Sequence, residues 1–184
     1  IIDPRSYFAS KERFPNINVI NKWPKESFSE IKCDKNSALI TLTHDPKIDD
    51  PAIQLALENK CPIIHASTSE IYGNPLETPQ AESYLGNVNS WGPRACYDEG
   101  KRAAEALCYD YKNMYSLDVR PVRIFNTYGP FMQLDDGRIV TNIVRSFLES
   151  RPVTVYGDGL QSRSFCYIDD LIDGLILLMK HGPI

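Results

Sequence analysis

A tyrosine and a lysine four residues apart are the side chains of this sequence best suited to chemistry. Tyr97 and Lys101 lie in a stretch with a helical pattern, and residues four apart share one face of a helix, one turn apart. A nearby ammonium favours the phenolate, so Lys101 is expected to lower the pKa of Tyr97 from about 10 towards neutrality. The pair would then be a general base able to take a proton from a sugar hydroxyl at cellular pH.

A second group of polar residues precedes this pair. Thr68, Ser69 and Glu70 follow a short apolar run, which predicts two hydroxyls and a carboxylate at the end of a strand. The Y-x-x-x-K pattern alone occurs by chance on many surface helices. The two segments together, in this order, are a much stronger indication of an active site.

Length and composition predict one ordinary globular domain. The chain has 184 residues, of which 42% are hydrophobic and 24% are charged, enough for a proper core. A net charge of -4 gives no general affinity for nucleic acid or an acidic membrane. No apolar run is long enough for a membrane span. The five cysteines form no C-x-x-C pair, which favours reduced thiols in a cytoplasmic protein.

The hydrophobic pattern alternates between strands and helices, which is typical of a parallel sheet. In the longest predicted helix, the stripe expected to face the core is Ala103, Leu107, Tyr111 and Met114. Asp49 or Asp50 is expected to cap an earlier helix, with Pro51 at its first position. Strands are predicted at 18–21, 38–43, 62–66, 119–125, 153–156 and 162–168, and helices at about 50–60, 95–115, 139–148 and 169–179.

Five blocks of the sequence match a known family in order: residues 66–73, 92–102, 123–130, 135–138, and 154–157 together with 163–168. Through these blocks the chain from about Cys61 onward resembles the extended short-chain dehydrogenase/reductase family and, within it, the UDP-glucuronate decarboxylases, also called UDP-xylose synthases. Phe131 departs from the family pattern, in which Arg often follows Gly-Pro. The resemblance implies an α/β fold with a Rossmann-type doubly wound parallel sheet that uses NAD.

The segments at residues 2–5, 12–15 and 42–52 match another family. Through them residues 1–60 resemble the Rossmann domain of xanthine dehydrogenase accessory proteins, so residues 1–184 are interpreted as a single Rossmann-like domain of hybrid origin with a junction near Lys60. In either parent, the first strand and its Gly-rich turn would precede Ile1. That turn holds the pyrophosphate of NAD. We therefore expect a sheet without this strand and turn, a substrate lobe that stops near Ile184, and impaired activity.

The resemblance to the decarboxylases implies a role for each residue of the first two groups. Tyr97 would take the proton of the C4 hydroxyl, Lys101 would also bind the nicotinamide ribose, and Thr68 would hydrogen-bond the C4 oxygen. Glu70 would orient water or protonate C5, or else would be a loop carboxylate that accepts backbone N–H groups. Ser69 stands where sister 4,6-dehydratases carry an aspartic acid, which favours decarboxylation over dehydration, with 4-epimerisation between them.

Four later residues are implied to contact substrate or cofactor. Asn126 matches a substrate contact of the family and Thr127 a cofactor contact. Arg138 and Arg163 are the candidates for the UDP diphosphate, because guanidinium groups bind phosphate in a bidentate manner. The alternative for each arginine is a surface ion pair.

The remaining assignments concern a pocket, a ribose, a metal and a partner. Tyr111 and Tyr156 would line the nucleotide pocket, or else be plain core aromatics, and Asp3 would reach the adenosine ribose. The substrate would be a UDP-sugar and the assembly a homodimer, with no nucleic acid or membrane partner. The rival class is a cofactor-free, non-enzymatic hybrid or a molybdoenzyme accessory-like domain. No metal is expected, because the spacing of the candidate ligands matches no known set; these are His44, Asp45, Asp49 and Asp50.

Overall fold

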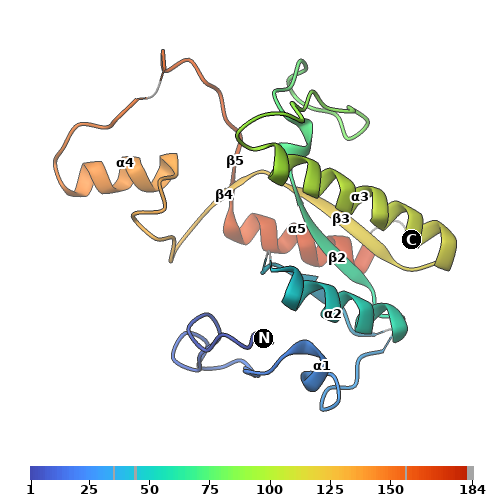
Figure 1. Cartoon of the computed structure of the whole chain (residues 1–184). Coiled ribbons are helices and arrows are strands. Elements are labelled where there is room, and N and C mark those ends of the chain that lie inside the picture. Colours follow the sequence, from blue (N-terminus) through green and yellow to red (C-terminus); the bar gives the residue numbers. More distant parts are fainter. Residues whose placement is uncertain (35, 44, 156, 182–184) are drawn as a thin grey trace. The chain divides into compact units, whose positions relative to one another are not determined.

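The computed structural model describes residues 1–34, 36–43, 45–155 and 157–181. Within them the chain divides after Arg123 into two compact units. Each unit contains parallel strands accompanied by helices (Figure 1), which agrees with the predicted α/β class.

Unit 1 is built on a three-stranded sheet with the strand order β1-β2-β3. The strands are β1 (Leu39–Thr41), β2 (Ile63–Thr68) and β3 (Val119–Ile124). β1 and β2 run parallel, with Ile40 opposite Ile64. Helix α2 (Pro46–Glu58) connects β1 to β2, and α3 (Ala95–Tyr115) connects β2 to β3. These connections are the crossovers that parallel pairing requires.

The core of unit 1 lies where α2 meets the sheet. Ala56 of α2 packs with Cys61, Ile63 and Val119, and all four are buried. The short helix α1 (Pro24–Ser27) contacts α2. The strand predicted at 18–21 is reduced to a single bridge between Ile2 and Ile20.

Replacing Ile64 by alanine is expected to lower the free energy of unfolding by about 3 kcal/mol, because it removes buried methyl groups and leaves a cavity. Ile64 is only 2% exposed and is the second residue of β2. Its register partner Ile40 is 41% exposed, so Ile40→Ala should cost about 1 kcal/mol or less. Urea unfolding of both variants measures the difference, and equal losses would contradict this assignment of the core.

The helix predicted from residue 50 begins earlier in the structure. Asp45 is its N-cap, because the Asp45 carboxylate accepts a hydrogen bond from the backbone N–H of Lys47 at 3.0 Å. Asp49 and Asp50 therefore lie inside the helix, and Pro51 is not its first residue. The prediction failed because three acidic residues near the start could each have capped it.

Helix α3 has the predicted bounds, but its predicted inner face is wrong. Leu107 is 57% exposed and Met114 is 71% exposed. The side of α3 that is shielded from solvent carries Lys101, Glu105 and Cys108 instead. The hydrophobic pattern misled here because the contacts of this helix with β2 are largely polar, as the hydrogen bonds described below show.

Unit 2 contains the parallel pair β4 (Asn126–Tyr128) and β5 (Phe165–Tyr167). Helix α5 (Ile168–His181) contacts both strands, and α4 (Ile139–Leu148) has the predicted bounds. The strand predicted at 153–156 is not formed at residues 153–155, and Tyr156 lies outside the described residues. Among the helices that the structure describes, none is both long and apolar enough to cross a bilayer.

Candidate active site

The polar triplet lies where β2 ends and the chain turns. Thr68 is the last residue of β2 and the N-cap of the 3-10 helix η1 (Ser69–Tyr72), and its buried hydroxyl accepts a hydrogen bond from the backbone N–H of Glu70 at 3.3 Å. Ser69 and Glu70 form the first turn of η1 and are partly exposed. Parallel strands commonly present functional side chains at their carboxyl ends.

Lys101 joins α3 to the same strand. Its Nζ donates a hydrogen bond of 2.8 Å to the carbonyl oxygen of Ala66, two residues before Thr68. Burial lowers the pKa of Lys101, and the charge of the Asp49 carboxylate opposes that shift. The ammonium is thereby fixed near the end of β2.

Tyr97 lies one helical turn before Lys101 and is 37% exposed. The guanidinium of Arg94 lies over its ring, with Cζ 5.7 Å from the ring centroid. Arg94 also pairs with Glu70, whose carboxylate oxygen is 3.2 Å from Nη2. Arg94 therefore links the helix that carries Tyr97 to η1. No predicted role falls on Arg94, although its place three residues before Tyr97 could have suggested one.

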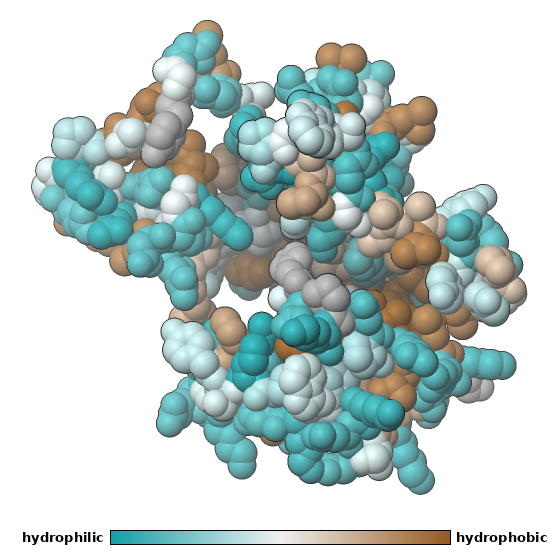
Figure 2. All heavy atoms as spheres, in the orientation of Figure 1, coloured by the Kyte–Doolittle hydropathy of each residue, from teal (hydrophilic) through white to brown (hydrophobic). Residues whose placement is uncertain are grey.

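A groove of about 1170 Å³ opens in unit 1 between α2 and α3. Tyr97, Lys101 and Tyr111 lie on its α3 wall, while Thr41 and Asp49 line it from β1 and α2. On the face drawn in Figure 2, hydrophobic residues reach the surface among hydrophilic ones, in agreement with the exposure of many large hydrophobic side chains. The structure thus brings Tyr111 to the same groove as the tyrosine and lysine of the predicted base.

Asp3 has a partner of its own within unit 1. Its carboxylate accepts hydrogen bonds from Nε and Nη2 of Arg5 at 2.9 and 2.8 Å. The hydrogen bond from Arg5 is the main cause that lowers the pKa of Asp3. Asp3 is buried and its carboxylate is engaged, so its role at a ribose stays a prediction.

The other predicted contacts belong to unit 2, where each makes local interactions. Asn126 donates its amide N–H to the carbonyl of Ser164 at 3.1 Å, and the Thr127 hydroxyl donates to Phe125 at 3.2 Å. The Arg138 guanidinium lies 3.6 Å from Asp136. The Arg163 guanidinium donates a hydrogen bond of 2.7 Å to the carbonyl oxygen of Ser162. Tyr156 is outside the described residues.

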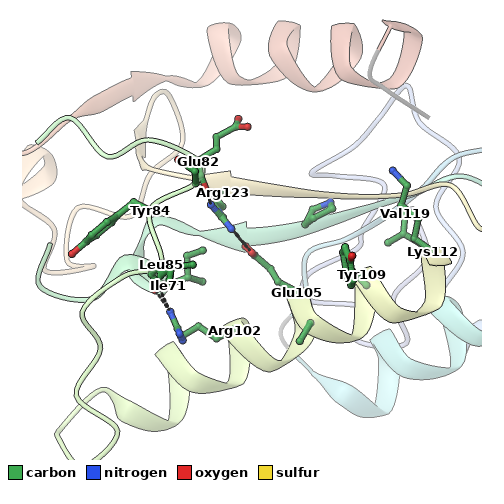
Figure 3. Close-up of a pocket in the computed structure, with 14 residues that line it drawn as sticks. Ile71, Glu82, Tyr84, Leu85, Arg102, Glu105, Tyr109, Lys112, Val119 and Arg123 are labelled. Atoms are coloured by element: carbon green, nitrogen blue, oxygen red, sulfur yellow. Dashed lines mark hydrogen bonds and ion pairs between the residues drawn. The ribbon is translucent and has the colours of Figure 1, made fainter. Parts of the chain in front are cut away.

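A second polar cluster, which the sequence analysis missed, surrounds Glu105 at a pocket of about 590 Å³ (Figure 3). The Glu105 carboxylate accepts a hydrogen bond of 2.5 Å from the Ser67 hydroxyl. Arg123 of β3 donates to the same carboxylate, with the shortest contact 2.8 Å from Nη2 to Oε2. A glutamate and an arginine 18 residues apart give no local signal in the sequence.

The pH dependence of stability should include a contribution from Glu105. Burial raises the pKa of Glu105, but hydrogen bonds from Arg123 and Ser67 outweigh it, so the folded-state pKa lies below the ordinary value of 4.5. The resulting stability is present above that value and is lost as pH falls through the folded-state pKa. We therefore expect Glu105→Gln to lose less stability than wild type on acidification, measured by urea unfolding at a series of pH values. Parallel losses would contradict the assignment.

Comparison with known proteins defines the class of this chain. The chain belongs to the NAD dependent epimerase/dehydratase family, whose profile matches residues 31–184. Its α/β architecture with parallel sheets is the Rossmann-like fold of that family. Among the residues that the structure describes, no group of three or more His, Cys, Asp or Glu side chains is arranged to hold a metal ion.

Two curated proteins and one solved structure show which members of the family this chain is similar to. UDP-glucuronic acid decarboxylase 1 of Arabidopsis thaliana is 59% identical over 118 residues, 64% of this chain and 27% of that protein. UDP-glucuronic acid decarboxylase 1 of Xenopus tropicalis is 45% identical over 157 residues, 85% of this chain and 35% of that protein. The structure of UDP-glucuronic acid 4-epimerase from Bacillus cereus, with UDP-glucuronic acid and NAD, matches with a TM-score of 0.62 and 28% identity, over 74% of this chain and 41% of that one. The chain spans about a third of the length of these curated relatives.

The family profile begins at residue 31 and so includes half of the segment that resembles accessory proteins. The similarity to UDP-glucuronic acid decarboxylases confirms the resemblance seen from Cys61 onward. The hybrid origin of residues 1–60 stays a prediction.

Proposed function

We propose that this chain carries the catalytic residues of an NAD-dependent nucleotide-sugar enzyme, and that its reaction is decarboxylation of UDP-glucuronate to UDP-xylose through a 4-keto intermediate. One observation supports it above the others. The Lys101 ammonium is fixed at the end of β2 by its bond to Ala66, on the helix that carries Tyr97 and beside the Thr68 turn. Identities of 45% and 59% to UDP-glucuronic acid decarboxylases support the choice of reaction.

The side chains present suit the nicotinamide half of NAD, which supplies a hydride acceptor when bound. An ammonium has three N–H donors, and Ala66 accepts one from Lys101. The others are suited to the hydroxyls of a ribose, as is the partly exposed phenol of Tyr97. Thr127 and Asp3 are the further candidates for cofactor contacts.

In the proposed reaction Tyr97 takes the proton of the C4 hydroxyl as the C4 carbon is oxidised. The Thr68 hydroxyl donates a hydrogen bond to the C4 oxygen, and the bond from Lys101 to Ala66 keeps the helix that carries Tyr97 at the end of β2. The resulting ketone is β to the carboxylate, so the C5–carboxylate bond can break with release of CO2. Its electron pair then enters an enolate that the ketone stabilises.

The enolate carbon C5 must next be protonated, and C4 must be reduced again. Glu70, whose carboxylate pairs with Arg94 at 3.2 Å, is the candidate to orient the water that protonates C5. Ser69 stands beside it and is a poor acid for expelling a hydroxide, which disfavours 4,6-dehydration. Return of hydride to C4 and of the proton from Tyr97 would complete UDP-xylose, and the reaction balances as UDP-glucuronate plus one proton, taken up at C5, giving UDP-xylose and CO2.

The UDP group would be bound by residues of the later part of the chain. Arg138 and Arg163 are the candidates for its diphosphate and Asn126 for the sugar, while Tyr111 lines the groove that Tyr97 shares. Tyr156 stays a candidate from the sequence. The side chain of Arg138 is 69% exposed, so its guanidinium can be reached by an anionic ligand.

A homodimer in the cytoplasm is the proposed setting. Helix α3 exposes several apolar and aromatic side chains: Met114 is 71% exposed, and Leu107 and Tyr115 are exposed where they line the groove. A second copy would cover such a surface. The five cysteines are free thiols, which fits a reducing compartment.

Incubation of the chain with UDP-glucuronate, with and without NAD+, tests the proposed function. We expect UDP-xylose and CO2 in equal amounts, formed only when NAD+ is present. UDP-galacturonate as the sole product would support 4-epimerisation, the second candidate, which the similarity to the Bacillus cereus epimerase favours. Absence of any product, together with no heat of NAD+ binding by calorimetry, would contradict the proposal and support the cofactor-free alternative.

A further inference from the structure

Helix α3 buries little apolar surface, although Cys108 packs against the core cluster of unit 1. None of its 21 residues, all of which the structure describes, is fully buried, and its N-cap Arg94 makes no side-chain capping bond. Its apolar residues are exposed instead, as Leu107 and Met114 show. Directional polar contacts must therefore contribute much of what fixes its rotation against β2, and with it the direction in which Tyr97 points.

The Glu105 carboxylate makes the most extensive of these contacts. It accepts from the Ser67 hydroxyl of β2 at 2.5 Å and from Arg123 of β3, whose Nε lies 3.2 Å from each oxygen and whose Nη2 lies 2.8 Å from Oε2. Figure 3 shows the carboxylate and the guanidinium pointing toward each other from α3 and β3. One side chain of α3 thus joins both strands.

Arg123 extends this contact to the turn that follows β2. Its Nη1 donates to the hydroxyl of Tyr72 at 2.9 Å and to the carbonyl of Glu82 at 2.7 Å. The guanidinium also lies over the Tyr72 ring, 5.1 Å from the centroid. Tyr72 is the last residue of η1, whose first residues are Ser69 and Glu70. The ion pair of Glu105 and Arg123 is therefore linked both to α3, which carries Tyr97 and Lys101, and to η1, which carries Ser69 and Glu70.

We infer that Glu105 is a positioning residue for the proposed active site, holding Lys101 and Tyr97 of α3 against the end of β2 through Ser67 and Arg123. This inference rests on the proposed function for its catalytic meaning. Lys101 and Glu105 are four residues apart, a spacing at which opposite charges on a helix pair readily. Because Ser67 and Arg123 hold the carboxylate toward the strands, Lys101 instead donates to Ala66.

Chemical labelling of lysine tests the inference without using substrate. The full chain is labelled briefly with acetic anhydride, and the acetylation of Lys101 is measured by mass spectrometry relative to the exposed Lys25 of α1. Glu105→Gln should raise this ratio by about tenfold, the change expected when a hydrogen bond that holds a charged group is lost. Glu99→Gln is the matched control, because Glu99 of α3 pairs only weakly, at 3.5 Å, with Arg102 of the same helix, and it should leave the ratio unchanged.

Folding is checked by circular dichroism for every variant. An unchanged ratio in folded Glu105→Gln would overturn the inference. If Glu105→Gln does not fold, Ser67→Ala decides, because it removes a single hydrogen bond; a rise of about threefold is expected, and no rise would overturn the inference.

Turnover supplies the catalytic readout. Where UDP-xylose is formed, Glu105→Gln should lower kcat about tenfold while KM changes little, as for an interaction that orients reacting groups. A change confined to KM would contradict positioning. Failure of the proposed function would appear as absence of product in wild type while the labelling difference remains, so the two failures are distinguishable.

Discussion

Replacing Tyr97 by phenylalanine is expected to lower the rate of UDP-xylose formation by about 10²- to 10⁴-fold, the usual contribution of a positioned general base. The substitution removes one hydroxyl from a side chain that is 37% exposed, so the fold should be unaffected. The ring that lies beneath Arg94 is kept. The measurement is product formed per enzyme at saturating UDP-glucuronate and NAD+.

The matched control for this substitution is Tyr109→Phe. Tyr109 lies on the same helix, is 70% exposed and lines the pocket beside Glu105 rather than the groove. It should keep the wild-type rate. Full turnover by Tyr97→Phe would remove Tyr97 from the proposed mechanism, whereas equal losses in both variants would point to a general effect of removing phenols from α3.

Replacing Gly73 by alanine is expected to destabilise the fold by about 4 kcal/mol, since it combines backbone strain with a collision. Gly73 ends η1 with φ +63°, a conformation that glycine adopts freely. A Cβ at this position would lie 2.2 Å from the carbonyl oxygen of Asn87. That oxygen accepts a hydrogen bond from Asn74, and the Asn87 N–H donates to Tyr72, so the backbone cannot yield without losing both.

Gly100→Ala is the control, because we expect it to raise the free energy of unfolding where Gly73→Ala lowers it. Gly100 lies inside α3, and a Cβ there would meet nothing within 4 Å. Alanine should therefore stabilise the helix by about 0.5 to 1 kcal/mol. Urea unfolding of both variants gives the comparison. Similar midpoints for the two variants would contradict the tight turn at Gly73.

Local signals explain which parts of the fold could be predicted. The bounds of α3 and α4 were predicted as found, because a helical pattern between loop residues is a property of the sequence nearby. The N-cap at Asp45 was missed because neighbouring acids compete for that position. The rotation of α3 was missed for a different reason, since it depends on hydrogen bonds to strands that are distant in the sequence.

In the candidate site, too, the residues with a local sequence signal could be predicted and those that depend on distant contacts could not. Tyr97, Lys101 and Thr68 could be selected as candidates because their spacing follows the geometry of one helix and one strand end. Arg94 and Glu105 were not, because an arginine or a glutamate acquires a partner only once the chain has folded. The contacts predicted for unit 2 rest on the family resemblance, and each now has a described local neighbour except Tyr156.

The polar inward side of α3 also affects how this chain should respond to random substitution. In an ordinary helix, hydrocarbon side chains of similar volume can replace one another toward the interior. Positions 101 and 105 instead hold groups that point along particular bonds, so even a close mimic in size would lose them. Toward solvent, exposed positions away from the groove, such as 114, should accept most replacements in the isolated chain. The map of mutational tolerance along this helix is therefore expected to be the reverse of the usual one.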